Sequence, residues 1–313
     1  MKVLVTGGAG FIGSHVVDAF VAGGHEVVVV DDLSTGRESN LNPRARFYKL
    51  DIRDAKLADV FEREQPEIVD HHAAQMDVRR SVADPLFDAD VNVRGTINLL
   101  ECSRTYGVRK VVYISTGGAV YGEPEYLPCD EDHPINPVCQ YGVSKHVAEH
   151  YLYVYKALYG LDYAVLRYPN VYGPRQNPHG EAGVIAIFTG RMMADQPVTV
   201  NGSGAQERDF VYVADCASAN LLAATMPVSG IFNLGCGVGT TVNLIFSELK
   251  HIIVYSREAQ YGPAKLGETS KIYLDSRRAR AALNWAPTVG LHDGLQATVA
   301  YFRENELQAA QGI

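Results

Sequence analysis

Cysteine is sparse in this sequence, and its few residues form no recognisable pattern. Cys102, Cys129, Cys139, Cys216 and Cys236 are odd in number, scattered along the chain, and include no Cys-x-x-Cys pair. A disulfide scaffold and a cysteine-based zinc cluster both need regular spacing, so the sequence excludes both. We therefore expect free thiols, no bound metal, and a reducing compartment, the cytoplasm.

The sequence also lacks a surplus of positive charge and any long apolar run. Lys and Arg number 28 against 36 Asp and Glu, which leaves a net charge of −8. Nucleic acids and anionic membranes are held by clustered positive charge, so neither is an expected partner. No apolar stretch reaches the roughly 18 residues that cross a bilayer, and MKVLVTGGAG has none of the features of a secretion signal. A small anionic substrate stays compatible with this charge if a few Arg and Lys residues hold it.

What the sequence does have is a regular alternation of strand and helix patterns. Its 313 residues, 47% of them hydrophobic, suggest about two domains. Short apolar runs such as 3–5 and 27–30 alternate with helical patterns such as 11–22 and 141–159. Strands separated by helices in this way predict an α/β fold with a doubly wound parallel sheet of the Rossmann type.

The alternation breaks after Asn170. Residues 171–183 are rich in Gly, Pro, Asn and His, which is typical of loops, and only short strand and helix patterns follow. We predict a Rossmann domain over residues 1–170 and a smaller mixed α/β substrate lobe over 171–313. The segment at about 208–232 is expected to return to the first domain.

A glycine-rich turn joins the first predicted strand to the first predicted helix. It reads G-x-x-G-x-x-G from Gly7 through Gly10 to Gly13, and Asp31 ends the second strand 18 residues later. Such glycines allow a tight turn and a close approach of backbone to a diphosphate, which the helix N-terminus then attracts. A carboxylate at the end of the second strand accepts hydrogen bonds from adenosine ribose hydroxyls and repels a 2′-phosphate. The pattern predicts NAD rather than NADP.

A second candidate site lies in YGVSK, residues 141–145. Tyr141 and Lys145 are four residues apart and so share one face of a predicted helix. An isolated tyrosine is a poor base because its pKa is near 10. A neighbouring ammonium group favours the phenolate, which would allow Tyr141 to act as a general base.

Further motifs follow in order along nearly the whole chain. They are TGGAGFIGSH (6–15), DDLSTG (31–36), LDIRD (50–54), HHAAQ (71–75), NVRGT (92–96), STGGAVYGE (115–123), YGVSK (141–145), RYPNVYGPRQ (167–176) and RDFVYVAD (208–215). Together they resemble the extended short-chain dehydrogenase/reductases, in particular the UDP-glucose 4-epimerase (NAD-dependent epimerase/dehydratase) group. The resemblance implies a Rossmann-type fold, bound NAD and a UDP-sugar substrate.

The resemblance also implies which residues hold cofactor and substrate. Cofactor contacts are expected at Gly7, Gly10, Phe11, Ile12, Gly13, Asp31, Asp32, Ser34, Thr35, Gly36, Asp51, Ile52, Ala73, Ala74, Gln75, Asn92, Tyr141, Lys145 and Tyr168 or its neighbour Pro169. Substrate contacts are expected at Ser115, Thr116, Tyr141, Asn170, Val184, Val198, Val200, Arg208 and Lys265. Among these, Val198 and Val200 would lie beside the uracil and Arg208 at the diphosphate.

Two positions depart from the pattern of the family. Gly117 stands where relatives commonly have a catalytic Ser or Thr, so Thr116 or a water beside Gly117 is expected to supply the missing hydrogen bond. Lys265 stands where relatives often have Arg, which implies a looser grip on the diphosphate. The pair Gly117-Gly118 also lacks the two carboxylates of the sugar 4,6-dehydratases, which argues against dehydration.

The predicted function is NAD-dependent inversion of carbon 4 of a UDP-hexose, UDP-glucose or UDP-galactose, through a 4-keto intermediate. Tyr141 would take the proton of the 4-hydroxyl, and Lys145 would keep the phenol acidic and bind the nicotinamide ribose. The resemblance implies a homodimer through helices near 86–105 and 141–159, which are apolar at positions 97, 99, 100, 147, 151 and 154. Two alternatives stay open. One is a nucleotide-sugar epimerase or reductase for another sugar, N-acetylated or uronic, and the other is an NAD-binding regulator without turnover.

Overall fold

The main body is a seven-stranded parallel sheet, which confirms the predicted doubly wound α/β fold. The computed structural model describes residues 1–178, 183–264 and 269–311, except for the side chains of 306–311. The strands lie in the order β11-β6-β5-β4-β1-β2-β3, and each neighbouring pair is parallel. Their bounds are β1 Lys2–Thr6, β2 Glu26–Asp31, β3 Arg46–Lys49, β4 Ile68–His71, β5 Lys110–Thr116, β6 Asp162–Tyr168 and β11 Gly230–Asn233.

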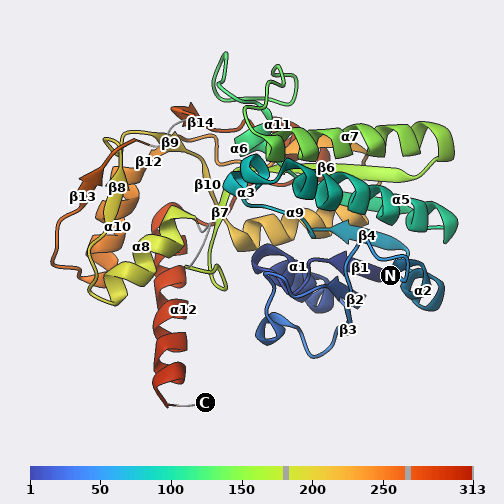
Figure 1. Cartoon of the computed structure of the whole chain (residues 1–313), viewed down its shortest axis with the longest axis horizontal. Coiled ribbons are helices and arrows are strands. Elements are labelled where there is room, and N and C mark those ends of the chain that lie inside the picture. The colour runs from blue at the N-terminus through green and yellow to red at the C-terminus, as the bar shows by residue number, and fades with distance from the viewer. Residues whose placement is uncertain (179–182, 265–268, 312–313) are drawn as a thin grey trace.

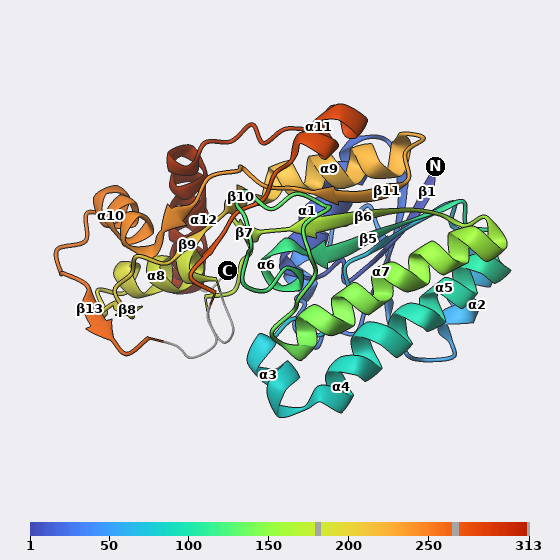
Figure 2. The ribbon, with the colours of Figure 1, turned by 90° about the horizontal axis from the view of Figure 1, so that it is seen from above.

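Helices cover both faces of this sheet (Figure 2). One face carries α1 (Phe11–Ala22), α9 (Val213–Thr225) and α11 (Arg277–Leu283), and the other carries α2 (Leu57–Glu64), α5 (Thr96–Thr105) and α7 (Gln140–Tyr159). The long helix α7 stops at Gly160, whose φ of +73° a glycine adopts without steric cost. Within the described residues, no helix combines the length and the hydrophobicity needed to cross a membrane.

The predicted helix near 86–105 is interrupted in the structure. Its place is taken by α3 (Val78–Ala83), α4 (Pro85–Ala89), a π-helical turn labelled η2 (Asp90–Gly95) and then α5. Such turns often occur at functional sites. The turn contains Asn92, whose carboxamide makes two hydrogen bonds with the backbone of the loop after β4. A side-chain bond of this kind is invisible to hydrophobic periodicity, so the sequence predicted a continuous helix.

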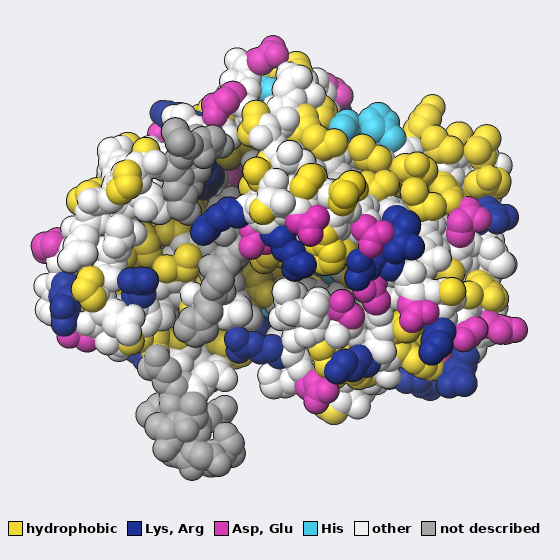
Figure 3. Space-filling model, in the orientation of Figure 1, with side chains coloured by type: hydrophobic (Ala, Val, Ile, Leu, Met, Phe, Trp, Pro, Cys, Tyr) yellow, Lys and Arg dark blue, Asp and Glu magenta, His cyan; other side chains and the backbone are white. Residues whose placement is uncertain are grey.

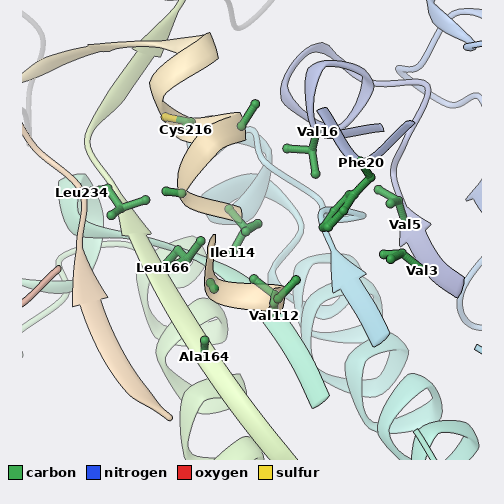
Figure 4. Packing of buried hydrophobic residues seen from close by; sticks show 14 of the residues in the cluster. Val3, Val5, Val16, Phe20, Val112, Ile114, Ala164, Leu166, Cys216 and Leu234 are labelled. Atoms are coloured by element: carbon green, nitrogen blue, oxygen red, sulfur yellow. The ribbon is translucent and has the colours of Figure 1, made fainter. Parts of the chain in front are cut away.

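Buried side chains form a separate core on each face of the sheet. Successive strand residues point to opposite faces, so Val3 and Val5 pack under α1 and α9 in the core of Figure 4, whereas Leu4 packs under α2, α5 and α7. Leu99 and Leu100, expected on an association face, are instead fully buried in the second core. Helical periodicity marks an apolar face but does not tell which neighbour covers it.

The smaller lobe lies beyond the carboxyl edge of the sheet (Figure 1). It contains α8 (Val184–Met193), α10 (Val242–Ile253) and α12 (Leu291–Gln311), with small sheets made of β7 (Asn170–Tyr172), β8 (Thr199–Asn201), β9 (Glu207–Arg208), β10 (Phe210–Tyr212), β12 (Thr240–Thr241), β13 (Gln260–Gly262) and β14 (Lys271–Ile272). Phe188, Phe246 and Leu295 help to form a third core between its helices. After β10 the chain re-enters the main body, and β11 pairs with β6 at the edge of the sheet. This crossing and return place the lobe against the strand ends.

Candidate active site at the carboxyl edge of the sheet

The glycine turn lies pressed between β1, α1 and the end of β4. Gly7 has a φ of +69°, and a Cβ atom there would lie 2.6 Å from the backbone nitrogen of Ala73. A Cβ on Gly13 would overlap the carbonyl oxygen of Gly7. Both positions therefore need glycine. The N-terminus of α1 has no side-chain cap, so its first N–H groups can receive the diphosphate of a dinucleotide.

Asp31 closes the adjacent corner of the site. Its carboxylate accepts hydrogen bonds from the backbone N–H groups of Ala9 (3.0 Å) and Leu33 (2.8 Å). Burial raises the pKa of Asp31, and these two bonds oppose the increase. A Cβ on Gly36 would lie 2.8 Å from Oδ1 of this carboxylate. Glycine at position 36 thus allows the backbone to approach Asp31 closely, where the adenosine ribose is expected.

The other predicted contacts of the adenosine end lie nearby in sequence but differ in exposure. Ser34 donates from its backbone and its hydroxyl to Oδ1 of Asp32, at 2.8 and 2.6 Å, and Thr35 is exposed. Asp51 pairs with Arg53, which lowers the pKa of that carboxyl, whereas Ile52 is almost fully buried. Phe11, Ile12, Ala73 and Ala74 are partly exposed at the same strand ends.

A carboxamide network fixes the loop after β4. Asn92 accepts a hydrogen bond from the backbone N–H of Gln75 (2.8 Å) and donates to its carbonyl oxygen (2.9 Å). Asn92 also donates to the hydroxyl of Ser144 on α7 (3.0 Å). The buried Asp88 accepts from the carboxamide of Gln75 (2.8 Å). Asn92 therefore ties the loop after β4 to the helix that carries Tyr141.

Tyr141 and Lys145 lie one turn apart on α7, beside the end of β5. Burial raises the pKa of the Tyr141 phenol, and a hydrogen bond with Thr116 opposes this shift. Burial lowers the pKa of Lys145 to about 7, although the carboxylates of Glu149 and Asp88 favour its charged form. The ammonium nitrogen lies 4.2 Å from the ring centroid of Tyr113. The three predicted catalytic side chains, Tyr141, Lys145 and Thr116, thus lie close together.

Beneath this group is a buried ion pair that the motifs did not reveal. Glu149 accepts hydrogen bonds from Arg167 Nε (3.0 Å) and Nη2 (2.6 Å) and from the Ser115 hydroxyl (2.6 Å). A hydrogen bond with His146, together with these bonds, lowers the pKa of Glu149 to about 2, despite its burial. Ser115, a predicted substrate contact, is buried and its hydroxyl is bonded to Glu149. The only sequence signal for Glu149 is its position one helical turn after Lys145.

The departure at Gly117 has a steric cause. A Cβ atom on Gly117 would overlap the side chain of Leu274, which follows β14. At Gly118 the nearest atoms to an added Cβ are Asn170 Oδ1 and Thr116 Oγ1, both at 3.8 Å. A serine at 117 would therefore have to displace Leu274, whereas a side chain at 118 would make only ordinary van der Waals contacts with two polar groups.

Three residues predicted to contact cofactor or substrate have buried side chains in the structure. Tyr168 is buried and accepts a hydrogen bond from Asn220 of α9, so its ring lies under the sheet. The side chains of Val198 and Val200 are fully buried in the third core, which leaves only their backbone for a ligand. The reason is tertiary: α8 and α10 pack over this strand.

The remaining residues predicted to contact substrate belong to the segment of the smaller lobe. Val184 begins α8 and is partly exposed. Arg208 donates to the carbonyl oxygen of Glu207 (2.9 Å). Lys265 lies outside the described residues. Across residues 1–178, 183–264 and 269–311, no group of three or more His, Cys, Asp or Glu side chains is arranged to hold a metal ion.

The chain is similar to known enzymes over almost its full length. It is 45% identical to the UDP-glucose 4-epimerase of Mycolicibacterium smegmatis over 310 residues, which are 97% of this chain and 99% of that protein. Its fold matches the crystal structure of Thermotoga maritima UDP-glucose 4-epimerase with UDP-glucose, with a TM-score of 0.96, 48% identity, and coverage of 98% and 100% of the two chains. The Thermus thermophilus UDP-glucose 4-epimerase in complex with NAD gives a TM-score of 0.93, 44% identity, and coverage of 97% and 99%.

The family model described as NAD dependent epimerase/dehydratase family matches residues 3–235. This range contains the glycine turn, Asp31, the carboxamide network and the Tyr141–Lys145 helix. The match and the similarities above agree with the resemblance inferred from the motifs. The chain therefore belongs to the NAD dependent epimerase/dehydratase family.

Proposed function

We propose that this protein is an NAD-dependent epimerase that inverts carbon 4 of a UDP-hexose and interconverts UDP-glucose and UDP-galactose. The observation that carries the proposal is the placement of Tyr141, Lys145 and Thr116 together at the edge that also holds the glycine turn and Asp31. Relatives at 44–48% identity, with structures containing NAD and UDP-glucose, support it. Bound NAD supplies an acceptor for the hydride of carbon 4 and returns it within the same turnover.

Tyr141 is the proposed general base for the 4-hydroxyl. Burial alone favours the neutral phenol, so positive charge must favour the phenolate when substrate is bound. Lys145 supplies that charge from the next turn of α7, with Glu149 and Asp88 supporting its ammonium form. Thr116 donates or accepts a hydrogen bond beside the phenol, which replaces the hydroxyl excluded from position 117.

The lobe is proposed to hold the rest of the substrate. Asn170 Oδ1 lies near Gly118, as does Thr116 Oγ1, and can bond a sugar hydroxyl. We assign Arg208 to the diphosphate of the substrate. Lys265 is proposed as a second cation that binds the same diphosphate. Such charge-assisted bonds hold the diphosphate while the 4-keto sugar rotates and presents its other face to the cofactor. Residues 1–170 and 171–313 are the proposed cofactor and substrate units, with 208–232 belonging to the first.

We also propose a homodimer that acts in the cytoplasm. Apolar side chains are exposed on α7, including Val143, Tyr153, Val154 and Leu158, and Figure 3 shows hydrophobic side chains gathered where Figure 1 places this helix. An apolar patch of this kind favours association with a second copy. All five cysteines are unpaired, which supports a reducing compartment. Sedimentation that detects only monomer at micromolar concentration would contradict the dimer.

The first experiment omits added cofactor. The purified protein is incubated with UDP-glucose, UDP-galactose and their N-acetylated forms, and the products are separated. We expect interconversion of the first two without added NAD. Conversion of only an N-acetylated sugar would point to another epimerase, and no conversion of any would favour the non-catalytic alternative.

The second experiment changes Tyr141. Tyr141→Phe should lower turnover by about 10²–10⁴-fold while NAD released on denaturation stays stoichiometric. The matched control is Tyr153→Phe, because Tyr153 is on the same helix but is 63% exposed. Turnover retained in Tyr141→Phe would remove this residue from the mechanism.

The third experiment tests Thr116. Thr116→Ala should lower turnover by about 10²-fold if its hydroxyl shares in proton transfer. Thr225→Ala on α9 is the control, since Thr225 is exposed and remote from the site. Unchanged kinetics in Thr116→Ala would assign the missing hydrogen bond to a water instead.

A further inference from the structure

Two histidines face one another on the exposed side of α7. His146 and His150 are one turn apart, and their Nε2 atoms are 3.1 Å apart. The ring centroids are 4.6 Å apart with an interplanar angle of 71°. His150 is exposed and the His146 side chain is 24% exposed. The two Nε2 atoms are thus within hydrogen-bond distance, and both rings reach the surface of α7 in the single chain.

The surroundings of His146 decide which of its nitrogens is free to coordinate. Its Nδ1 lies 3.1 Å from Oε2 of Glu149. That carboxylate is the buried partner of Arg167, so it accepts a hydrogen bond and cannot donate one. The proton of a neutral His146 ring therefore belongs on Nδ1, and its Nε2 accepts the hydrogen bond from His150 Nε2 in the metal-free protein. On metal binding the proton of the His150 ring moves to its Nδ1, which leaves both Nε2 lone pairs for the ion.

The separation of the two nitrogens matches chelation of one metal ion. A zinc–imidazole bond is about 2.0–2.1 Å long. Two such bonds that meet at an angle between a right angle and the tetrahedral value bring their nitrogens to about 2.9–3.4 Å. The observed distance lies inside this range without any movement of the helix.

We propose that His146 and His150 chelate one divalent transition-metal ion of the kind that prefers imidazole, such as Zn²⁺, through their Nε2 atoms. Water completes the coordination of the ion. Glu149 then acts as the carboxylate that orients a metal-bound imidazole through its other nitrogen, an arrangement that strengthens metal sites. The pair lies on the same helix as the exposed Val143 and Val154, and histidine side chains are visible beside the apolar surface in Figure 3.

This site is separate from the proposed chemistry, although Glu149 connects the two. Glu149 also holds Ser115 and Arg167 beneath Lys145. Because neither histidine is among the residues proposed for catalysis, the metal-free protein should keep its activity. Because the pair lies on the face proposed for association, a second copy could replace the water ligands.

The test uses the full chain with its cofactor, without a histidine tag and freed of metal by a chelator. Zn²⁺ is titrated by calorimetry into the unchanged protein and into His146→Ala and His150→Ala. We expect saturable binding of one ion per chain, weakened at least tenfold in each variant, because one imidazole alone does not chelate. A ratio of one ion to two chains would also support the pair as ligands and would place two copies on one ion.

The matched control is His292→Ala on α12. His292 also bonds a carboxylate through Nδ1, at 2.8 Å from Glu248, but its Nε2 faces the carboxamide of Gln296 rather than an imidazole. This variant should bind Zn²⁺ like the unchanged protein. His150→Ala should keep its thermal midpoint and turnover in metal-free buffer, which excludes a folding defect. Equal Zn²⁺ affinity in the unchanged protein and His150→Ala, or no saturable binding, would overturn the proposal.

Discussion

Two buried charged clusters on opposite faces of the main sheet differ in how completely they are hydrogen-bonded. Under α7, the side-chain oxygens and nitrogens of Glu149, Arg167 and Ser115 all have hydrogen-bond partners. Under α9, the carboxylate of Asp70 is fully buried and lies 2.9 Å from His72 Nε2, yet neither of its oxygens makes a well-aligned hydrogen bond. Asn220 Oδ1 on the same side also has no partner.

This difference follows the proposed chemistry. Lys145 and Tyr141 stand on the α7 side, where a partnered network holds them at defined positions, as preorganised catalysis requires. Tyr168 marks the other side, where its phenol meets Asn220. A buried carboxylate without aligned partners costs stability. We conclude that the buried ion pair under α7 is fully partnered, whereas the Asp70–His72 pair under α9 is poorly aligned.

The largest expected effect comes from breaking the network under α7. Glu149→Gln leaves the charge of Arg167 buried without a counter-ion, which should lower the free energy of unfolding by about 3–5 kcal/mol. Denaturant titration measures this change. Glu101→Gln is the control, because Glu101 forms a surface pair with Arg104, and such a pair contributes at most about 1 kcal/mol. Equal losses in the two variants would mean that the buried network under α7 stabilises the protein no more than a surface pair.

Lowering the pH should change the contributions of the two buried carboxylates to folding stability in opposite directions. The pKa of Glu149 is lowered from 4.5 to about 2, so its contribution is complete above pH 4.5 and is lost as the pH falls toward 2. The loss is about 3 kcal/mol. Burial raises the pKa of Asp70 above 3.8, so the cost of ionising it is relieved as the pH falls through its folded pKa.

Unfolding at a series of pH values separates these contributions. The unchanged protein should lose more stability than Glu149→Gln between pH 4.5 and 2. Asp70→Asn should lose more stability on acidification than the unchanged protein, since it lacks the compensating protonation. Identical pH profiles for all three proteins would contradict the assignment of opposite signs.

Replacing the poorly aligned pair under α9 should stabilise the protein or leave it unchanged. Asp70→Val combined with His72→Leu substitutes apolar side chains that suit the neighbouring core, and such replacements are neutral or gain about 1–4 kcal/mol. Each single variant leaves its former partner buried alone and should be less stable than the double variant. A loss of stability in the double variant larger than in either single variant would show that the pair is favourable.

The last prediction concerns the loss of stability caused by steric overlap alone, without a change in polar pairing. Gly117→Ser must displace Leu274 and should cost about 1–3 kcal/mol, whereas Gly118→Ser meets no atom closer than 3.8 Å to its Cβ. Adding Leu274→Ala to Gly117→Ser should relieve the overlap, so the two losses should not add. Strict additivity in this double-mutant cycle would mean that Leu274 does not exclude a side chain from position 117.

Local patterns in the sequence predicted much of the fold and the candidate site. Alternating strand and helix patterns predicted the parallel sheet, and the glycine turn has the steric need for glycine that its spacing implies. The four-residue spacing of Tyr141 and Lys145 placed them on one helix face, as observed. These features depend on residues close together in the chain, so periodicity and backbone sterics suffice to find them.

Other features needed contacts between residues far apart in the chain. Leu274 meets Gly117 across 157 positions, and Asn92 joins the loop after β4 to α7. Neither contact follows from spacing, because the chain between such residues imposes no fixed separation. The burial of Val198, Val200 and Leu99 likewise depended on which elements cover them.

The amino-acid order alone thus determined the strand–helix alternation, the bare glycine turn and the helix face that carries Tyr141 and Lys145, because each arises from interactions within a few residues. The tertiary structure decided which buried charges are compensated, which side chain a residue larger than glycine would meet at position 117, and how Glu149 orients both Arg167 and His146. Those outcomes depend on packing and on electrostatics at low dielectric, which exist only once distant segments have come together.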